Sequence, residues 1–303
     1  MSVSRINLAP DGPNFSRFVA GFWRLADWQL SVSARLELIE QYLALGITTM
    51  DHADIYGGYR CEQLFGDALA LKPSMRDQMQ IVTKCGIKLL NPDYPERYVK
   101  HYDTSKAHIL AAVDNSLSNL QCGYLDLLLI HRPDPLMNAD EVAEAFVTLR
   151  NNGKVKHFGV SNFTPAQFSL LQSRLDYPLV TNQVEISPLA METLHDGTLD
   201  QCQQQRVSPM AWSCLGGGRL LQSTSGHVQA LQKTLARIAD EIGADNIEQV
   251  IYAWVLQLPA KPLPIIGSGK VERIASAIKA EHLTLDRQQW FSICQAATGH
   301  PVP

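Results

Sequence analysis

Four polar side chains stand at, or shortly after, the ends of short apolar runs. They are Asp51, Tyr56, Lys84 and His131. A phenol is a weak acid at neutral pH because its ordinary pKa is near 10, and a neighbouring ammonium lowers that pKa. We therefore predict that Lys84 lowers the pKa of Tyr56 and that Asp51 keeps Lys84 protonated. His131 would donate a hydrogen bond to a substrate oxygen and orient it.

These side chains can act together only if the fold brings their strand ends to one place. Eight short β-branched or apolar runs recur along the chain and are predicted as strands: 19–23, 47–53, 80–86, 125–131, 157–162, 180–187, 207–213 and 262–268. Helical patterns such as 33–46, 105–120 and 139–154 stand between them. Eight strand–helix units joined by right-handed crossovers favour an α/β fold that closes as a (β/α)8 TIM barrel. A doubly wound open sheet is the alternative, but the first strand is followed by FWRLAD and not by a glycine-rich phosphate loop.

Both ends of the chain add elements to the eight units. An Asp-Gly turn within 5–18 predicts an N-terminal β-hairpin that plugs the N-terminal mouth of the barrel, and 286–298 predicts an extra C-terminal helix. No linker or shift in composition divides the sequence, so we expect one domain over residues 1–303.

Two connections, 87–103 and 214–227, are too long to be simple links. Both leave carboxyl ends of strands, the face on which barrels of this kind carry their active sites. Three tyrosines in the first connection, Tyr94, Tyr98 and Tyr102, are four residues apart. This spacing predicts a short helix with the tyrosines on one side, where they either line the pocket or pack the loop onto the rim. Substrate size would also depend on Trp23, Arg24 and Tyr59.

Composition excludes several classes of protein. The 26 basic and 30 acidic residues give a net charge of −4, and no basic excess points to nucleic acid or an anionic membrane. No window approaches 18 apolar residues and the start has no signal-peptide pattern, so we expect a cytoplasmic protein. The six cysteines are scattered and are expected to be reduced thiols. A complete barrel needs no partner to bury its core, so a monomer is expected.

The motifs around these side chains resemble those of the aldo/keto reductase superfamily. The resemblance lies in TTMDHADIYGGYRCEQLFGDAL, IVTKCG, LLLIHRPD, GKVKHFGVSNF, NQVEISP and PIIGSGKVERI, and it runs over nearly the whole chain. The superfamily signature is an Asp, Tyr, Lys and His tetrad in this order. DHADIYGGY, HRPDPLM and AWSCLGGGRL are similar to a bacterial branch of that superfamily, the YdhF-type predicted oxidoreductases.

The resemblance implies an NADPH-dependent reductase of aldehydes or ketones in which Tyr56 protonates the carbonyl oxygen. Trp23, Tyr56 and His131 would contact the substrate. The cofactor-binding residues it implies are Trp23, Ser161, Asn162, Gln183 and Trp212 around the nicotinamide, Ser213, Leu215, Gly216 and Gly218 around the pyrophosphate, and Gly267, Ser268, Lys270 and Arg273 at the adenosine end. Two cations beside Ser268 suit a 2′-phosphate, which favours NADPH over NADH.

Two other functions remain open at this point. A metal-dependent hydrolase could use Asp51, His52 and Asp54, but successive residues of a strand face opposite sides, so His52 would face away from Asp51, and no H-x-H or H-x-x-x-H pair appears elsewhere. We therefore expect no metal. A non-catalytic subunit that binds the nicotinamide cofactor and senses its redox state could also keep an intact tetrad.

Overall fold

A closed barrel of eight parallel strands forms the centre of the computed structural model, which describes residues 3–301. The strands, in their order around the barrel, are β3 (Val19–Gly21), β4 (Thr49–Asp51), β5 (Gln80–Cys85), β8 (Leu125–Ile130), β9 (Val155–Ser161), β10 (Asn182–Glu185), β11 (Met210–Trp212) and β12 (Leu263–Ile266). β12 pairs with β3 and closes the ring. Seven of the eight predicted runs contain one of these strands, and the run 157–162 overlaps β9, which begins earlier at Val155, so the predicted barrel is confirmed.

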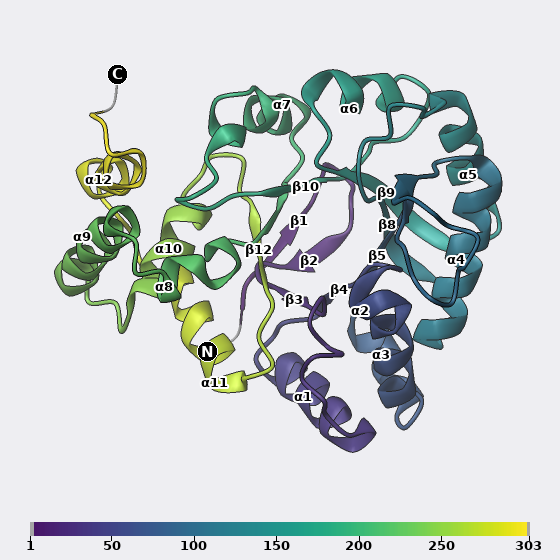
Figure 1. Ribbon diagram of the computed structural model, residues 1–303, viewed down its shortest axis with the longest axis horizontal. Coiled ribbons are helices and arrows are strands. Elements are labelled where there is room, and N and C mark those ends of the chain that lie inside the picture. The colour runs from purple at the N-terminus through teal and green to yellow at the C-terminus, as the bar shows by residue number, and fades with distance from the viewer. Residues whose placement is uncertain (1–2, 302–303) are drawn as a thin grey trace.

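Helices surround the barrel (Figure 1). The helices are α1 (Val32–Ala44), α2 (Tyr56–Tyr59), α3 (Cys61–Leu69), α4 (Lys106–Leu120), α5 (Ala139–Asn151), α6 (Pro165–Gln172), α7 (Thr198–Gln205), α8 (Arg219–Gln222), α9 (Gly226–Ile242), α10 (Ile247–Leu256), α11 (Val271–Ala277) and α12 (Arg287–Thr298). Because helices cover the outer face, a strand such as β8 is buried along its whole length, which explains its nearly unbroken apolar sequence LDLLLI.

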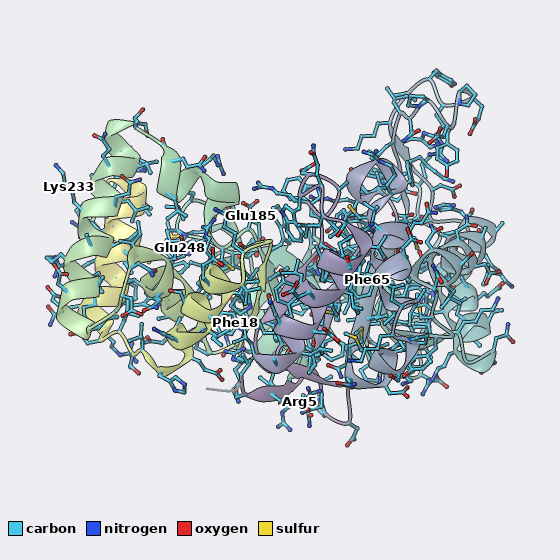
Figure 2. The ribbon with its side chains drawn as sticks, turned by 90° about the horizontal axis from the view of Figure 1, so that it is seen from below. Arg5, Phe18, Phe65, Glu185, Lys233 and Glu248 are labelled. Atoms are coloured by element: carbon cyan, nitrogen blue, oxygen red, sulfur yellow. The ribbon has the colours of Figure 1, made fainter. Side chains whose placement is uncertain are left out.

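The predicted N-terminal hairpin is present. β1 (Arg5–Asn7) pairs antiparallel with β2 (Asn14–Ser16), and the turn includes Asp11 at φ 57°. The Ser16 hydroxyl accepts the backbone N–H of Thr49, at the start of β4, over 3.1 Å. Figure 2 places Arg5 of this hairpin at the end of the barrel away from Glu185, the last residue of β10. The hairpin therefore closes the amino-terminal mouth and leaves the carboxyl-terminal mouth free.

The predicted C-terminal helix is also present as α12, which packs beside α9 (Figure 1). The indole of Trp290 stacks on that of Trp254 in α10, with ring centroids 5.0 Å apart. Each indole N–H donates to the backbone carbonyl of the other residue. This contact anchors a helix that is surplus to the eight strand–helix units.

The long connection after β5 differs from the prediction. Its ends form a short antiparallel pair, β6 (Ile87–Lys88) with β7 (His101–Tyr102), and residues 89–100 contain no helix. Pro92 and Pro95 explain this, because neither can donate a backbone hydrogen bond inside a helix. The predicted helix with three tyrosines on one side is therefore wrong.

The connection after β11 is mostly folded. It contains a 3-10 turn, η3 (Gly216–Gly218), and then α8, and α9 begins at Gly226.

Candidate active site

Lys84 is the centre of the tetrad. Its side chain is fully buried at the end of β5, and Nζ lies 2.9 and 2.8 Å from the two carboxylate oxygens of Asp51. The same Nζ donates to the carbonyl of His52 over 2.7 Å and to the hydroxyl of Tyr56 over 3.0 Å. The structure therefore brings Asp51, Lys84 and Tyr56 into direct contact, as the sequence predicts.

The charges of this cluster follow from burial and pairing. Burial in the barrel acts to lower the pKa of Lys84, but Asp51 and Tyr56 outweigh it, and the pKa is raised above its ordinary value. Lys84 is therefore an ammonium at neutral pH. Lys84 acts to lower the pKa of Tyr56, as predicted, but burial raises it by more, so the pKa of Tyr56 lies above its ordinary value. Tyr56 is consequently a neutral phenol that carries the proton a reductase would need.

His131 completes the tetrad at the end of β8. Its ring meets that of Tyr56 edge to face, with centroids 5.9 Å apart. Burial, followed by the charges of Lys84, Arg132 and Lys100, holds the pKa of His131 well below its usual range. The imidazole is therefore neutral. Its Nδ1 is buried without a hydrogen-bond partner.

A chain of hydrogen bonds leads from the tetrad toward the predicted nicotinamide residues. The side-chain nitrogen of Gln183 donates to Asp51 over 2.8 Å, and its backbone carbonyl accepts from Ser161 over 2.8 Å. The amide of Asn162 donates to Ser161 over 2.7 Å and accepts from the indole of Trp212 over 3.2 Å. The structure thus brings all four residues together. It also commits the Gln183 nitrogen to Asp51, which leaves Oε1 for a ligand.

Backbone conformation is unusual where β9 and β11 end. Asn162 and Ser213 have φ of 60° and 51°, a left-handed region that non-glycine residues seldom occupy. Gly217 and Gly218 have φ of 66° and 97°, and a methyl group added to either Cα would meet no atom within 4 Å. The backbone angles require glycine at both positions, and the space beside them is open, but the N–H of Gly218 already donates to the carbonyl of Leu215 over 3.0 Å.

The remaining pyrophosphate candidates lie in the same connection. Gly216 and Cys214 are buried and Leu215 is half-buried against the core.

Burial raises the pKa of the Cys214 thiol to about 12, and that of Cys85 is raised as well. Neither cysteine therefore has the lowered pKa of a redox-active thiol.

The predicted adenosine-end residues gather at the start of α11. The backbone N–H of Lys270 donates to the hydroxyl of Ser268 over 3.2 Å, and Gly267 is exposed beside them. Lys270 and Arg273 are both exposed, and Arg273 pairs with Glu248 of α10 at 2.9 Å. The sequence does not reveal this ion pair, because Glu248 lies on another helix.

Trp23 and Arg24 extend the mouth from the loop after β3. The side chain of Trp23 is 56% exposed, and the guanidinium of Arg24 lies over its ring at 5.2 Å. Arg24 also donates to the carbonyl of Gly217 over 3.3 Å, which joins this loop to the connection after β11. The contact of Trp23 with substrate and nicotinamide stays a prediction.

Arg132 is a further neighbour of the site, and the predictions from sequence do not include it. Its guanidinium lies 5.5 Å from the centroid of the Trp212 ring, and its charge acts on both Tyr56 and His131. Its position directly after His131 is the signal that could have revealed it.

Nothing in residues 3–301 groups three or more His, Cys, Asp or Glu side chains as a metal site. His52 stacks on Phe22 at 4.7 Å and meets Phe65 edge to face, and burial lowers its pKa to about 3. It therefore faces away from the tetrad, as the alternation along the strand predicts. No helix in this part of the chain is long and apolar enough to cross a membrane.

The chain matches a known protein family whose features include such a barrel and tetrad. Residues 17–297 match the aldo/keto reductase family, and the chain belongs to this family of oxidoreductases, which bind a nicotinamide cofactor and act on small carbonyl compounds. The resemblance to the aldo/keto reductase superfamily is thereby confirmed.

Curated relatives match over nearly the whole chain. The sequence is 60% identical to oxidoreductase YdhF of Escherichia coli over 99% of this chain and 100% of the relative. It is 47% identical to a 6-dehydroglucose reductase of Agrobacterium fabrum, with the same coverage. Among solved structures, the thermostable aldo-keto reductase Tm1743 superposes with a TM-score of 0.79 at 26% identity, over 97% of this chain and 99% of that one.

Proposed function

We propose that this protein is an NADPH-dependent reductase that converts an aldehyde or ketone to an alcohol, with Tyr56 as the proton donor. The observation that carries the proposal is the contact of Lys84 Nζ with the Tyr56 hydroxyl at 3.0 Å, inside a buried ion pair with Asp51. The proposal treats residues 1–303 as one domain.

The residues around the mouth fit a nicotinamide dinucleotide. Ser161, Asn162 and Gln183 would hold the carboxamide, and Trp212 would stack on the ring. The backbone at Ser213, Leu215, Gly216 and Gly218 would hold the pyrophosphate. When bound, the cofactor supplies the hydride, and the protein supplies alignment and electrostatics.

The tetrad would supply the proton and stabilise the charge that develops. Tyr56 would transfer its phenolic proton to the carbonyl oxygen as that oxygen becomes negative. The ammonium of Lys84 would stabilise the phenolate that remains, and Asp51 would hold Lys84 in place. His131, as a neutral imidazole, would donate its ring N–H to the carbonyl oxygen and align it with Tyr56.

The preference for NADPH rests on the start of α11. Lys270 is exposed there beside Ser268, and Arg273 lies three residues further along the same helix turn. A phosphate dianion gains more from two cations than a ribose hydroxyl does. Arg273 would have to share its charge between the phosphate and Glu248.

A sugar aldehyde is the substrate class we favour. The relative from Agrobacterium fabrum, 47% identical, is named 6-dehydroglucose reductase, and a second relative of this name from Novosphingobium aromaticivorans is 37% identical. The mouth offers partners for a hydroxylated carbonyl compound: Arg24, Arg132 and Glu185 are polar, while the exposed ring of Trp23 presents an aromatic face.

Titration with NADPH and with NADH, in the presence of EDTA, tests the cofactor site. Trp23 and Trp212 should lie near the nicotinamide, so tryptophan emission should be quenched saturably by NADPH at micromolar concentration and far more weakly by NADH. Absence of quenching by either nucleotide would contradict the proposal. Loss of activity on chelation would instead favour the metal-dependent alternative.

A further inference from the structure

The turn directly after the catalytic Tyr56 is strained. Three consecutive residues, Gly57, Gly58 and Tyr59, have φ of 59°, 65° and 71°. Glycine tolerates this region, but a bulky residue such as Tyr59 does not adopt it without support from its surroundings. The contacts of the Tyr59 side chain must therefore hold this conformation in place.

Tyr59 is held by the loop of residues 89–100, which we call the 89–100 loop. Its hydroxyl accepts the backbone N–H of Leu89 over 2.9 Å and a guanidinium N–H of Arg97 over 2.8 Å. Its ring meets that of Tyr94 edge to face at 5.0 Å, and Arg97 stacks on Tyr94 at 3.7 Å. Asn91 adds a hydrogen bond of 3.2 Å to the carbonyl of Gly58.

These contacts link the loop to the catalytic tyrosine. Residues of the loop form hydrogen bonds with Gly58 and Tyr59, which follow Tyr56 by only two and three positions. Elsewhere the loop has few anchors: Tyr98, on the same loop, is 93% exposed. The Tyr59 hydroxyl is therefore the central fixed point of an otherwise exposed segment.

The loop stands between two strands of the tetrad. It begins shortly after Lys84, beyond the β6–β7 pair. At its far base, the hydroxyl of Thr104 donates to Asp134 in the connection that follows His131, over 2.9 Å. The loop rises above the level of Glu185 at the upper right of Figure 2. A substrate that extends beyond its carbonyl group would meet this loop.

We propose that Tyr59 is a specificity-determining residue: it fixes the 89–100 loop as one wall of the substrate site, so that extended carbonyl substrates such as sugar aldehydes bind against it. This inference rests on the proposed reductase function. Tyr59 acts through the loop and is a positioning residue. A small aldehyde that occupies only the space beside Tyr56 and His131 gains nothing from this wall.

Limited trypsin digestion of Tyr59→Phe tests the anchor without any assay of activity. The Arg97 side chain is only 11% exposed because it is engaged by Tyr59 and Tyr94, so the peptide bond after Arg97 should resist cleavage in the wild-type protein. Loss of two hydrogen bonds to the tyrosine hydroxyl should speed cleavage at this bond by about fivefold or more. Tyr98→Phe, on the same loop, is the matched control and should cleave at the wild-type rate.

Kinetics with two substrates test the specificity. For a sugar aldehyde, Tyr59→Phe should raise KM by about five- to tenfold with little change in kcat. For propanal, and for NADPH binding, the variant should match the wild type. A simple structural defect would lower kcat for both substrates. Wild-type KM for the sugar aldehyde would overturn the inference, as would unchanged cleavage after Arg97.

The two proposals fail in different ways. A wild-type protein that reduces neither aldehyde contradicts the proposed function, and with it the assignment of the loop as a substrate wall. The cleavage rates still decide in that case whether Tyr59 anchors the loop.

Discussion

The two ends of the proposed cofactor site are built differently. At the tetrad, Lys84 is fully buried and Nζ is in contact with both Asp51 and Tyr56. At the proposed adenosine end, Lys270 is exposed and Arg273 forms an ion pair with Glu248. The groups that would carry the chemistry are already arranged, whereas the groups that would bind phosphate still have to rearrange around it. Preorganised charge speeds a reaction, and rearrangement weakens binding.

Tyr56→Phe should have the largest effect. It removes the proton donor while leaving the ring, so kcat for carbonyl reduction should fall by about 10²- to 10⁴-fold. NADPH binding, followed by tryptophan quenching, should be unchanged because the hydroxyl contacts Lys84 and not the predicted cofactor residues. Tyr98→Phe, at an exposed position, serves as the control. Undiminished turnover in Tyr56→Phe would show that Tyr56 is not the proton donor and that the reaction does not take place at the tetrad.

Lys84→Met tests how strongly the tetrad is preorganised by its buried ion pair. The substitution leaves the Asp51 carboxylate buried without its cation, which should cost about 3–5 kcal/mol of stability. Urea unfolding measures this loss. The double variant Lys84→Met/Asp51→Asn should recover part of the stability, because it removes the unpaired charge, but none of the activity. Wild-type stability of the single variant would mean that the pair contributes little.

Glu248→Gln sharpens the contrast at the adenosine end. It removes the carboxylate that occupies Arg273, at 2.9 Å, and frees the guanidinium for the 2′-phosphate. We expect NADPH to bind about threefold more tightly and NADH to bind as before, since an exposed pair contributes under about 1 kcal/mol. Fluorescence titrations with the two nucleotides measure the change. Equal tightening of both nucleotides would show that Arg273 does not face the 2′-phosphate.

A change of pH should have the smallest effect on kcat. The pKa of Tyr56 is raised, mainly by burial, so the phenol stays protonated and active at pH values below its ordinary pKa near 10. The pKa of His131 is lowered, mainly by burial, so the imidazole is already neutral well below pH 6.5. Between about pH 6.5 and 9, kcat for reduction should therefore vary by less than about twofold. A titration near pH 6.5 would contradict a permanently neutral His131.

The sequence predicts the secondary-structure elements that position the site. The eight strands, the hairpin and the C-terminal helix follow from apolar periodicity and turn residues, and each occurs where it is expected. Because parallel strands end at one face, the positions of Asp51, Lys84 and His131 at strand ends suffice to predict that they meet. Their contact does not depend on details of loop conformation.

The features that the sequence misses depend on contacts between distant segments. The pKa of Tyr56 rises because of burial, which residue types alone do not quantify. The hydrogen bond between Gln183 and Asp51 joins positions 132 residues apart, and the ion pair between Arg273 and Glu248 joins two helices. The tyrosine spacing in 87–103 predicts a helix, but the two prolines in that segment prevent it. The monomeric state and the cytoplasmic location stay predictions.

Consumption of NADPH in the presence of a carbonyl panel tests the central claim most directly. The panel should include a sugar aldehyde, and the loss of reduced nicotinamide absorbance should be matched by formation of one alcohol per NADPH. The account predicts steady turnover that follows saturation kinetics for at least one aldehyde or ketone. Saturable NADPH binding without oxidation by any member of the panel would contradict it and favour a protein that senses the cofactor.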